Sequence, residues 1–305
     1  MPFKISSSDI IGLEDEDCRG YGSYGIVYAV TVRGTARIAK RLHSIFVGAN
    51  VCQSDKQMIR EKFLNECLLL SKLDHPNVVK FVGVHFSPQD RSDAILIMEQ
   101  LHMDLHKFLQ DPEQHPDIDT YTKLSILPDV SSGLLYLHTQ LAKPILHRDL
   151  TAHNILLTED FKRAKIADFG MSKLIDHHLH RSVTCTECPG GFAYMPPEAF
   201  TDSPKYDTPL DVFSFGQLSL YVALQQFPVV ELELPPEQSI RAYQQGEVAI
   251  LKRKKWLDKL PADHCLRDLI LSCLRDDPSK RPSTERLNAQ MMELCHGHSE
   301  KGILY

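Results

Sequence analysis

The sequence predicts an α+β protein in two unequal parts, a small antiparallel β-sheet with one helix followed by a larger, mainly helical part. The first hundred residues hold short runs rich in valine, isoleucine and tyrosine, which are typical of strands, around a single amphipathic helix. From Asp211 onward the apolar residues recur at helical spacing almost to the end. We therefore expect the boundary near Glu99–Asp104, and 305 residues are enough for a sizeable core.

The first part is expected to be a sheet interrupted by one helix. Strand-like residues lie on both sides of Gly34, which predicts a hairpin, and a polar, glycine-containing segment between His43 and Gln57 predicts a surface loop before the helix. The expected elements are strands Ile26–Thr31 and Thr35–Lys40, helix Met58–Leu73, and strands Val78–His85 and Ala94–Met98. In the second part we expect an amphipathic helix, Leu124–Leu137, and a strand, Ala164–Ala167.

Composition argues against several classes of protein. The net charge of −6 disfavours a nucleic-acid binder, for which a basic excess is typical. The longest apolar stretch, Val212–Val230, is interrupted by Ser214 and three glutamines, so it predicts a buried helix and no membrane span. The first residues lack the pattern of a secretory signal, and eight irregularly spaced cysteines indicate reduced thiols. We therefore expect a cytoplasmic protein.

A glycine-rich motif is the first candidate site. Gly20, Gly22 and Gly25 form G-x-G-x-x-G, which by itself is also compatible with a simple glycine-rich turn or with a dinucleotide fingerprint. A fingerprint needs a helix directly after it, whereas the residues from Ile26 to Val30 are strand-like. The motif therefore favours a hairpin whose backbone N–H groups can approach phosphates closely.

Lys40 and Glu66 are the second candidate pair. A lone lysine at the end of a strand, or a lone glutamate on a helix, is usually a solvated surface charge. Together they can form an ion pair that holds the ammonium group of Lys40 against phosphate oxygens.

Two motifs in the second half are far more specific. Residues 147–154 read His-Arg-Asp-Leu-Thr-Ala-His-Asn, which fits H-R-D-L-x-x-x-N, and Asp168-Phe169-Gly170 begins fourteen residues after Asn154. The order of these motifs resembles the eukaryotic protein kinase family, and most closely its tyrosine-kinase-like group. Three later segments agree with the resemblance, namely Met195–Glu198, Asp211–Gly216 and Asp277–Pro282, in which Arg281 is expected to pair with Glu198.

The resemblance implies the two-lobed protein kinase fold over residues 9–295, with an N-terminal lobe at 9–101, a C-terminal lobe at 102–295 and a tail at 296–305. It implies transfer of the γ-phosphate of ATP to serine or threonine hydroxyls of protein substrates, in intracellular signalling. Expected partners are protein substrates and ATP, without nucleic acid. Two alternatives stay open, namely tyrosine or dual specificity, and a pseudokinase that binds nucleotide without catalysis.

The resemblance also assigns roles to the polar residues. Asp149 is expected to accept a hydrogen bond from the substrate hydroxyl, and Lys40, paired with Glu66, to contact the α- and β-phosphates. Asp168 and Asn154 are expected to hold two Mg²⁺ ions, with Mn²⁺ as an alternative, because both supply hard oxygen ligands. Lys40, Asp149 and Asp168 are all intact, which favours an active enzyme over a pseudokinase.

The adenine site is expected to be an apolar sandwich. Val27 and Ile38 cover one face of the base and Leu156 the other, Met98 is the gatekeeper, and the backbone from Glu99 to Leu101 supplies hydrogen bonds. Ile38 replaces the alanine that is usual in the family. Overpacking of this kind costs on the order of 1–3 kcal/mol unless the pocket repacks.

Other departures concern specificity and regulation. Thr151 and His153 match neither the usual serine/threonine-kinase loop nor the usual tyrosine-kinase loop. The catalytic loop therefore does not indicate whether the substrate hydroxyl belongs to serine, threonine or tyrosine. Glu187 occupies the place of an activating phosphothreonine, where its carboxylate can pair with Arg148. The alternative is an exposed glutamate, with Thr184 or Thr186 as the phosphorylated switch. Histidines and cysteines between His177 and Cys188 can also suggest zinc, but a second C-x-x-C is missing.

Overall fold

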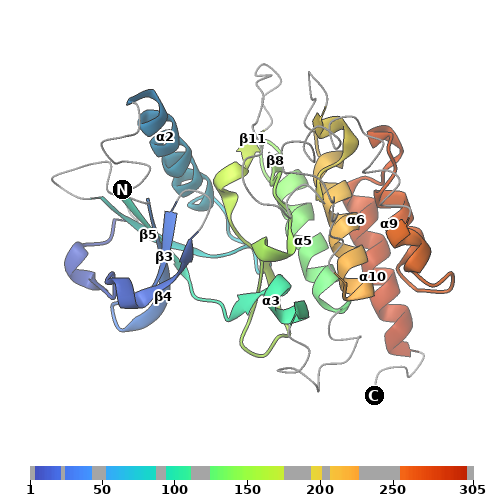
Figure 1. The fold of residues 1–305 in the computed structure, drawn as a ribbon, viewed down its shortest axis with the longest axis horizontal. Coiled ribbons are helices and arrows are strands. Elements are labelled where there is room, and N and C mark those ends of the chain that lie inside the picture. Colours follow the sequence, from blue (N-terminus) through green and yellow to red (C-terminus); the bar gives the residue numbers. More distant parts are fainter. Residues whose placement is uncertain are drawn as a thin grey trace. The chain divides into compact units, whose positions relative to one another are not determined.

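The computed structural model describes residues 4–21, 25–42, 53–86, 94–110, 124–174, 194–200, 207–226 and 255–300. The chain divides into two compact units (Figure 1). The first comprises Met1–His102 together with Ala167–Ser172, and the second comprises Met103–Ile166 and Lys173–Tyr305.

An antiparallel sheet forms the first unit. Its strands follow the order β1-β3-β4-β6-β5, and β2 pairs with β3. Their bounds are β1 Ile10–Ile11, β2 Cys18–Tyr21, β3 Gly25–Val32, β4 Thr35–Leu42, β5 Phe81–Phe86 and β6 Ala94–Glu99. The predicted hairpin is confirmed, since Val32 pairs with Thr35 around a turn in which Arg33 and Gly34 both have positive φ, 49° and 77°. Such a two-residue turn matches the right-handed twist of the strands that it joins.

Helix α2, Gln53–Leu70, begins before the predicted start at Met58 and ends before the predicted end at Leu73. Part of the segment expected to be a loop is therefore helical. Its first residues, Gln-Ser-Asp-Lys-Gln, are polar, so apolar periodicity cannot reveal that turn. Strand β5 likewise begins at Phe81 instead of Val78, although Val78 and Val79, just before it, are buried. Buried valines next to a strand thus lengthen the apparent strand in the sequence.

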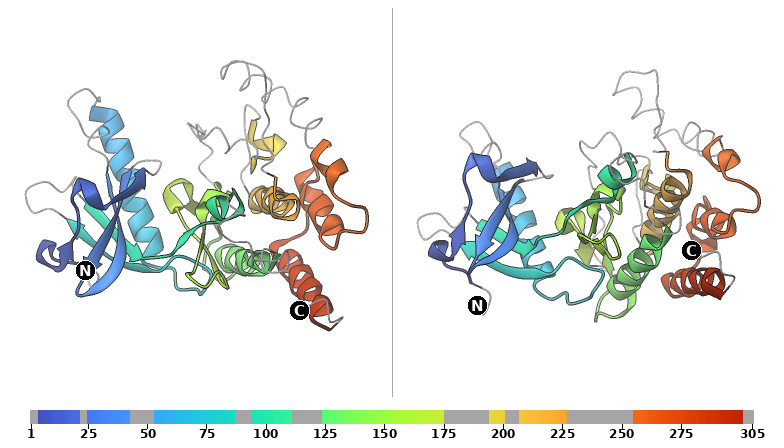
Figure 2. Two further views of the ribbon diagram at one scale, coloured as in Figure 1. Left: turned by 60° about the horizontal axis from the view of Figure 1, so that its bottom comes forward. Right: turned by 90° about the horizontal axis from the view of Figure 1, so that it is seen from below.

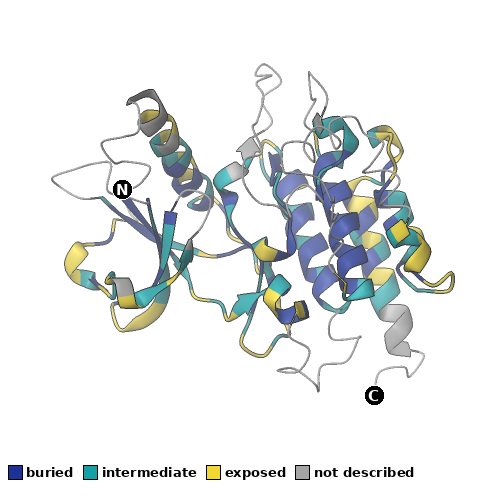
Figure 3. Cartoon of the chain, in the orientation of Figure 1, coloured by how far each residue is buried: buried dark blue, intermediate teal, exposed yellow. Residues whose placement is uncertain are grey.

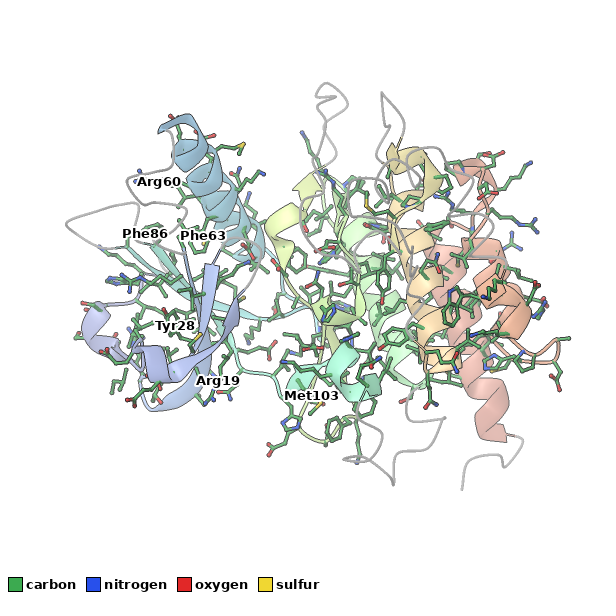
Figure 4. The ribbon with its side chains drawn as sticks, in the orientation of Figure 1. Arg19, Tyr28, Arg60, Phe63, Phe86 and Met103 are labelled. Atoms are coloured by element: carbon green, nitrogen blue, oxygen red, sulfur yellow. The ribbon has the colours of Figure 1, made fainter. Side chains whose placement is uncertain are left out.

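Residues 4–11, which we call the N-terminal strap, connect the two edges of this sheet. Lys4 forms a parallel bridge with Val84 of β5, and the N–H of Ile5 donates to the carbonyl of Val84 at 3.0 Å. At the other edge, Ile10 pairs with Val32 of β3. Ile5 and Ile10 are buried on one face of the sheet in a cluster with Tyr28, Val30, Val32, Ala39, Ile95 and Ile97. Figure 4 labels Tyr28 of this cluster, and Phe63, which is buried on α2.

The side chain of Ile5 is buried against one face of the sheet in the first unit. We expect Ile5→Ala to lower the free energy of unfolding by about 2–4 kcal/mol, because the shorter side chain leaves a cavity. Hydrogen exchange of the β3 and β5 amides measures this loss. Ile11→Ala is the matched control, because Ile11 is 71% exposed, and it should change stability by less than about 1 kcal/mol. Equal effects of the two variants would contradict the packing role of the strap.

Helices dominate the second unit, with two small sheets, β7-β9-β10 and β8-β11. The helices are α3 Leu105–Gln110, α5 Ile126–Thr139, α6 Pro209–Leu224, α9 Arg267–Cys273 and α10 Thr284–Glu300. The strands are β7 Met103–Asp104, β8 Ile145–Leu146, β9 Ile155–Leu157, β10 Ala164–Ile166 and β11 Lys173–Leu174. Helix α10 lies beside α5 (Figure 2), where Ser131 donates to Asn288 at 3.0 Å.

Helix α6 is the central element of the second unit. Every residue from Leu210 to Val222 is buried, which Figure 3 shows as a dark blue helix. The buried helix predicted over Val212–Val230 is thus present as far as Leu224, and residues 227–230 lie outside the described part of the chain. Among the described residues no helix is long and apolar enough to span a membrane. Gly216 allows α9 to approach, because a Cβ on Gly216 would lie 2.7 Å from the Cβ of Cys273. Close packing of α6 in turn fixes the residues at its N-terminal end.

Candidate active site

Three charged side chains meet inside the first unit. Lys40 on β4 donates to both carboxylate oxygens of Glu66 on α2, at 2.9 and 3.0 Å. Its Nζ also lies 2.9 Å from Oδ1 of Asp168, which immediately precedes the short 3₁₀ turn η4, Phe169–Met171. The predicted pairing of Lys40 with Glu66 is therefore present, and a second carboxylate joins it. Lys40 and Glu66 are each only 3% exposed.

Burial and charge act in opposite directions on Lys40. Burial lowers the pKa of its ammonium group, but the carboxylates of Asp168 and Glu66 outweigh burial and hold the pKa above its ordinary value. Lys40 therefore stays charged near neutral pH. Its ammonium group faces two carboxylates, and burial, together with the charge of Asp168, raises the pKa of Glu66.

Asp168 adopts a backbone conformation that is uncommon for residues other than glycine. Its φ is 58°, in the left-handed region, and its side chain accepts a hydrogen bond from the N–H of Gly170 at 3.2 Å. A Cβ on Gly170 would lie 3.2 Å from Asp168 Oδ1 and 3.6 Å from Glu66 Oε2. The absence of a side chain at Gly170 thus leaves room for the two carboxylates.

The catalytic-loop motif forms a compact group in the second unit. The side-chain amide of Asn154 donates to the backbone carbonyl of Asp149 at 2.7 Å and to its carboxylate at 2.9 Å. The N–H of Thr151 also donates to the carbonyl of Asp149, at 3.0 Å. Since the NH₂ group of Asn154 faces Asp149, its Oδ1 is the atom suited to ligate a metal ion. These contacts orient the carboxylate of Asp149.

A buried carboxylate at the start of α6 holds this loop. Asp211 accepts hydrogen bonds from the backbone N–H groups of His147 and Arg148, both at 2.8 Å. The Nε2 of His138, on α5, lies 2.9 Å from the same carboxylate. By accepting these bonds, the carboxylate of Asp211 stabilises Arg148 at a φ of 69°, which is strained for a residue with a side chain. No sequence motif pointed to His138, which directly follows the predicted helix Leu124–Leu137.

The hydrogen bonds to Asp211 also decide its protonation. Burial raises the pKa of this carboxyl group, but hydrogen bonds from His138 and from the N–H of Arg148, with the charge of His138, outweigh it. The pKa consequently lies below its ordinary value, so Asp211 is ionised at neutral pH.

A second predicted ion pair is also present in this unit. Arg281 donates from Nη2 to Glu198 Oε2 at 2.8 Å, and from Nη1 to the backbone carbonyl of Pro209 at 3.0 Å. Its Nε donates to the carbonyl of Arg275 at 2.8 Å. One guanidinium group thus connects the turn at Pro197–Phe200 with the first residue of α6.

The residues expected around adenine share one face of the sheet. Across neighbouring strands Val27 pairs with Lys40, and Ile38 pairs with Met98. Because side chains alternate along strands, these four lie on the face opposite the N-terminal strap. Ile38 and Met98 are only half-buried there. The N–H of Glu99 donates to the carbonyl of Lys80.

Some expected site residues lie elsewhere or outside the described residues. Leu156 lies on β9 of the second unit, paired with Lys165. Gly20 and Gly25 belong to β2 and β3, whereas Gly22 is not among the described residues. Leu101 is half-buried. The expected regulatory residues Thr184, Thr186 and Glu187 also fall outside the described part of the chain.

Comparison with known proteins agrees with the geometry. A family profile described as "Protein tyrosine and serine/threonine kinase" matches residues 14–291. The chain is 32% identical over 267 residues to "Serine/threonine-protein kinase VIK" of Arabidopsis thaliana, covering 87% of this chain and 56% of that protein. It is 31% identical over 284 residues to "Cysteine-rich receptor-like protein kinase 27" of the same organism, covering 87% of this chain and 40% of that protein. The chain thus spans about half the length of these relatives.

Asp211→Asn should lower the free energy of unfolding by about 2–5 kcal/mol, because the amide cannot accept all three hydrogen bonds and a buried donor loses its partner. Urea unfolding at pH 7 measures the change. Asp263→Asn, at an exposed aspartate, is the control. Its free energy of unfolding should stay within about 0.5 kcal/mol of that of the wild type.

The pH dependence supplies a second check. The stabilisation from ionised Asp211 is present above the unfolded pKa of about 3.9 and is lost as the pH falls through the lower folded pKa. The difference in the free energy of unfolding between the wild type and Asp211→Asn should therefore become smaller only below about pH 4. If this difference in unfolding free energy disappeared already between pH 7 and pH 5, Asp211 would not be the ionised group.

Proposed function

Because the chain belongs to the family of protein tyrosine and serine/threonine kinases, we propose that it transfers the γ-phosphate of ATP to serine or threonine hydroxyls of protein substrates. The observation that carries the proposal is the buried contact of Lys40 with Glu66 and Asp168, at 2.9 Å each. A charged lysine held between two carboxylates has little use in a purely structural core, where burying charge is costly. We assign the kinase domain to residues 9–295, with lobes at 9–101 and 102–295 and a tail at 296–305.

One face of the sheet carries both parts of the proposed nucleotide site. We assign the ammonium group of Lys40 to the α- and β-phosphates, and the apolar side chains of Val27, Ile38 and Met98 to the adenine base. The carboxylate of Asp168 and the Oδ1 of Asn154 are hard oxygen donors, which fits Mg²⁺ or Mn²⁺. A bound Mg²⁺ ion neutralises charge on the phosphate oxygens during transfer.

Asp149 acts on the acceptor. Its carboxylate, oriented by Asn154, accepts the hydrogen bond of the substrate hydroxyl and then its proton as the hydroxyl oxygen forms a bond to the γ-phosphorus. The bond between that phosphorus and the bridging oxygen breaks, and ADP leaves with the electron pair. Positioning and electrostatic stabilisation account for most of the rate enhancement in this type of reaction.

The proposed acceptor residue is supported by the relatives, and the proposed cellular compartment by the cysteines. Two relatives carry serine/threonine-protein kinase in their names, and one of them, "Serine/threonine-protein kinase 12" of Arabidopsis thaliana, is 32% identical over 254 residues. This favours serine and threonine over tyrosine. We place the reaction in intracellular signalling in the cytoplasm, where ATP and Mg²⁺ are abundant and the described cysteines, which are free thiols, stay reduced.

Radiolabelled ATP tests the activity directly. The purified chain is incubated with Mg²⁺, labelled ATP and a mixture of generic protein substrates. Acid hydrolysis of the labelled proteins should then yield phosphoserine and phosphothreonine. Label mainly on phosphotyrosine would overturn the acceptor assignment. Binding of ATP without any transfer, scored by thermal shift, would support a nucleotide-binding pseudokinase instead.

We expect Asp149→Asn and Asp168→Asn each to reduce kcat by at least about a hundredfold, because each removes a carboxylate that acts in the transition state. The melting temperature should change by only a few degrees, since neither residue is fully buried. Steady-state phosphorylation assays measure kcat, and circular dichroism spectra that match the wild type show that the variants are folded. Near-normal turnover in either folded variant would refute the role of that residue.

Ile38→Ala should lower the KM for ATP about threefold or more if isoleucine crowds the adenine site, and should leave kcat nearly unchanged because Ile38 contacts only the base. Ala36→Gly, at an exposed position on the same strand, serves as the control for general effects on β4. An unchanged KM with reduced stability would show that the pocket has repacked around isoleucine.

A further inference from the structure

The ring of His138 has a second hydrogen-bond partner besides Asp211. Its Nε2 lies 2.9 Å from the carboxylate of Asp211, and its Nδ1 lies 2.7 Å from the hydroxyl oxygen of Thr284. Thr284 is the first residue of α10, and Asp211 lies in the first turn of α6. One imidazole on α5 therefore connects the first turns of two other helices.

All three side chains are shielded from water. His138 is 4% exposed, Thr284 is 3% exposed and Asp211 is fully buried. Within the described part of the chain, the Thr284 hydroxyl bonds to this ring and to no other group. A buried polar atom that loses its partner is not rescued by water, so each bond of this group matters to its neighbours.

The ionised carboxylate of Asp211 determines which ring atom carries hydrogen. A carboxylate without a proton only accepts, so the ring donates from Nε2. Nδ1 is then an acceptor when the ring is neutral and a donor when the ring is charged. A hydroxyl can donate or accept, so Thr284 satisfies Nδ1 in both cases. A valine, which has the same shape, satisfies it in neither.

Two hydrogen bonds also fix the orientation of the ring. The rotation of a histidine ring about its Cβ–Cγ bond has only a broad intrinsic preference, so its contacts decide where it settles. With Nε2 as its single anchor, the ring can swing and lengthen the bond to Asp211. The bond to Thr284 holds a second point of the ring and restricts that motion.

The position of the Asp211 carboxylate matters to the reaction through the backbone. It accepts hydrogen bonds from the N–H groups of His147 and Arg148, both at 2.8 Å. Arg148 has a φ of 69° and directly precedes Asp149. A carboxylate that moves lets this strained backbone relax, and Asp149 moves with it.

Other contacts already hold the start of α10 in place. Arg281 donates to the carbonyl of Pro209 at 3.0 Å, and Ser131 on α5 donates to Asn288 on α10 at 3.0 Å. The packing of α10 thus has anchors on both sides of Thr284. Its hydroxyl is fixed by the helix, and the ring of His138 is the group that gains a fixed partner.

We propose that Thr284 is a positioning residue for phosphoryl transfer, which holds His138 and, through Asp211, the backbone before Asp149. This proposal rests on the proposed kinase function.

The test measures the rate of phosphoryl transfer in single turnovers, so that product release does not mask it. Thr284→Val keeps the branched shape but removes the hydroxyl, and should lower this rate about threefold to tenfold, the effect of one hydrogen bond. Thr284→Ala removes the same hydroxyl without a second methyl group and should lower the rate by a similar factor. Thr284→Ser restores the hydroxyl, and its rate should return to within about twofold of the wild type.

Ser131→Ala is the matched control. It removes a buried hydroxyl that links the same two helices, α5 and α10, but has no bond to His138. Its transfer rate should stay within about twofold of the wild type. The KM for ATP should change by less than about twofold in all variants, because Lys40 and its carboxylates belong to the first unit.

Nitrogen-15 NMR of labelled histidine reports on the ring itself. The signal of His138 is identified by its absence in His138→Phe. Its Nε2–H should exchange slowly with water in the wild type, in Thr284→Ser and in Ser131→Ala, and at least about threefold faster in Thr284→Val. Equal exchange in the wild type and the valine variant would contradict the hold of Thr284 on the ring.

A double-mutant cycle separates positioning from general damage. Because Thr284 acts through His138, Thr284→Val should have no further effect on the transfer rate when His138 is already phenylalanine. Additive effects, a serine variant as slow as the valine variant, or an equal loss in Ser131→Ala would overturn the positioning role while the kinase activity stands. No transfer to any protein by the wild type would overturn the proposed function, and the role of Thr284 with it.

Discussion

The catalytic loop depends on one buried carboxylate. Asp211, at the start of the most deeply buried helix, accepts two backbone N–H groups from the loop and a third hydrogen bond from His138. A backbone segment with a positive φ at Arg148 needs such support, because its own conformation is unfavourable. The helix fixes the carboxylate, the carboxylate fixes the backbone before Asp149, and Asn154 then orients the Asp149 side chain.

Charge is buried in two different ways in the two units. Lys40 faces two carboxylates, Glu66 and Asp168, whereas Asp211 is surrounded mainly by hydrogen-bond donors. The first arrangement keeps the ammonium group charged. The second keeps the carboxylate ionised and bound to the loop backbone, which suits a structural role.

Alternation along the strands gives the sheet two faces with different burial. Tyr28, Ala39 and Ile97 are buried under the N-terminal strap, so that face is closed by the chain itself. Ile38, Met98 and Lys40 belong to the opposite face, where Ile38 and Met98 remain half-exposed. A shift of one residue in register would exchange the two faces, so the buried isoleucines of the strap also fix which side chains lie on the opposite face.

The family, the α+β architecture and most elements were determined by the sequence alone, because ordered motifs and apolar periodicity are local properties of the chain. The pair Arg281–Glu198 was predictable because each member lies in a recognisable motif, and the pair Lys40–Glu66 from a lysine at the end of a strand and a glutamate on the following helix. Helix and strand ends were less predictable, because a polar first turn or buried valines next to a strand give a misleading pattern. Only the tertiary structure revealed His138 beneath Asp211 and the ring of His106 against His153. Those contacts join residues 73 and 47 positions apart in the sequence, and their partners are set by helix packing rather than by local spacing.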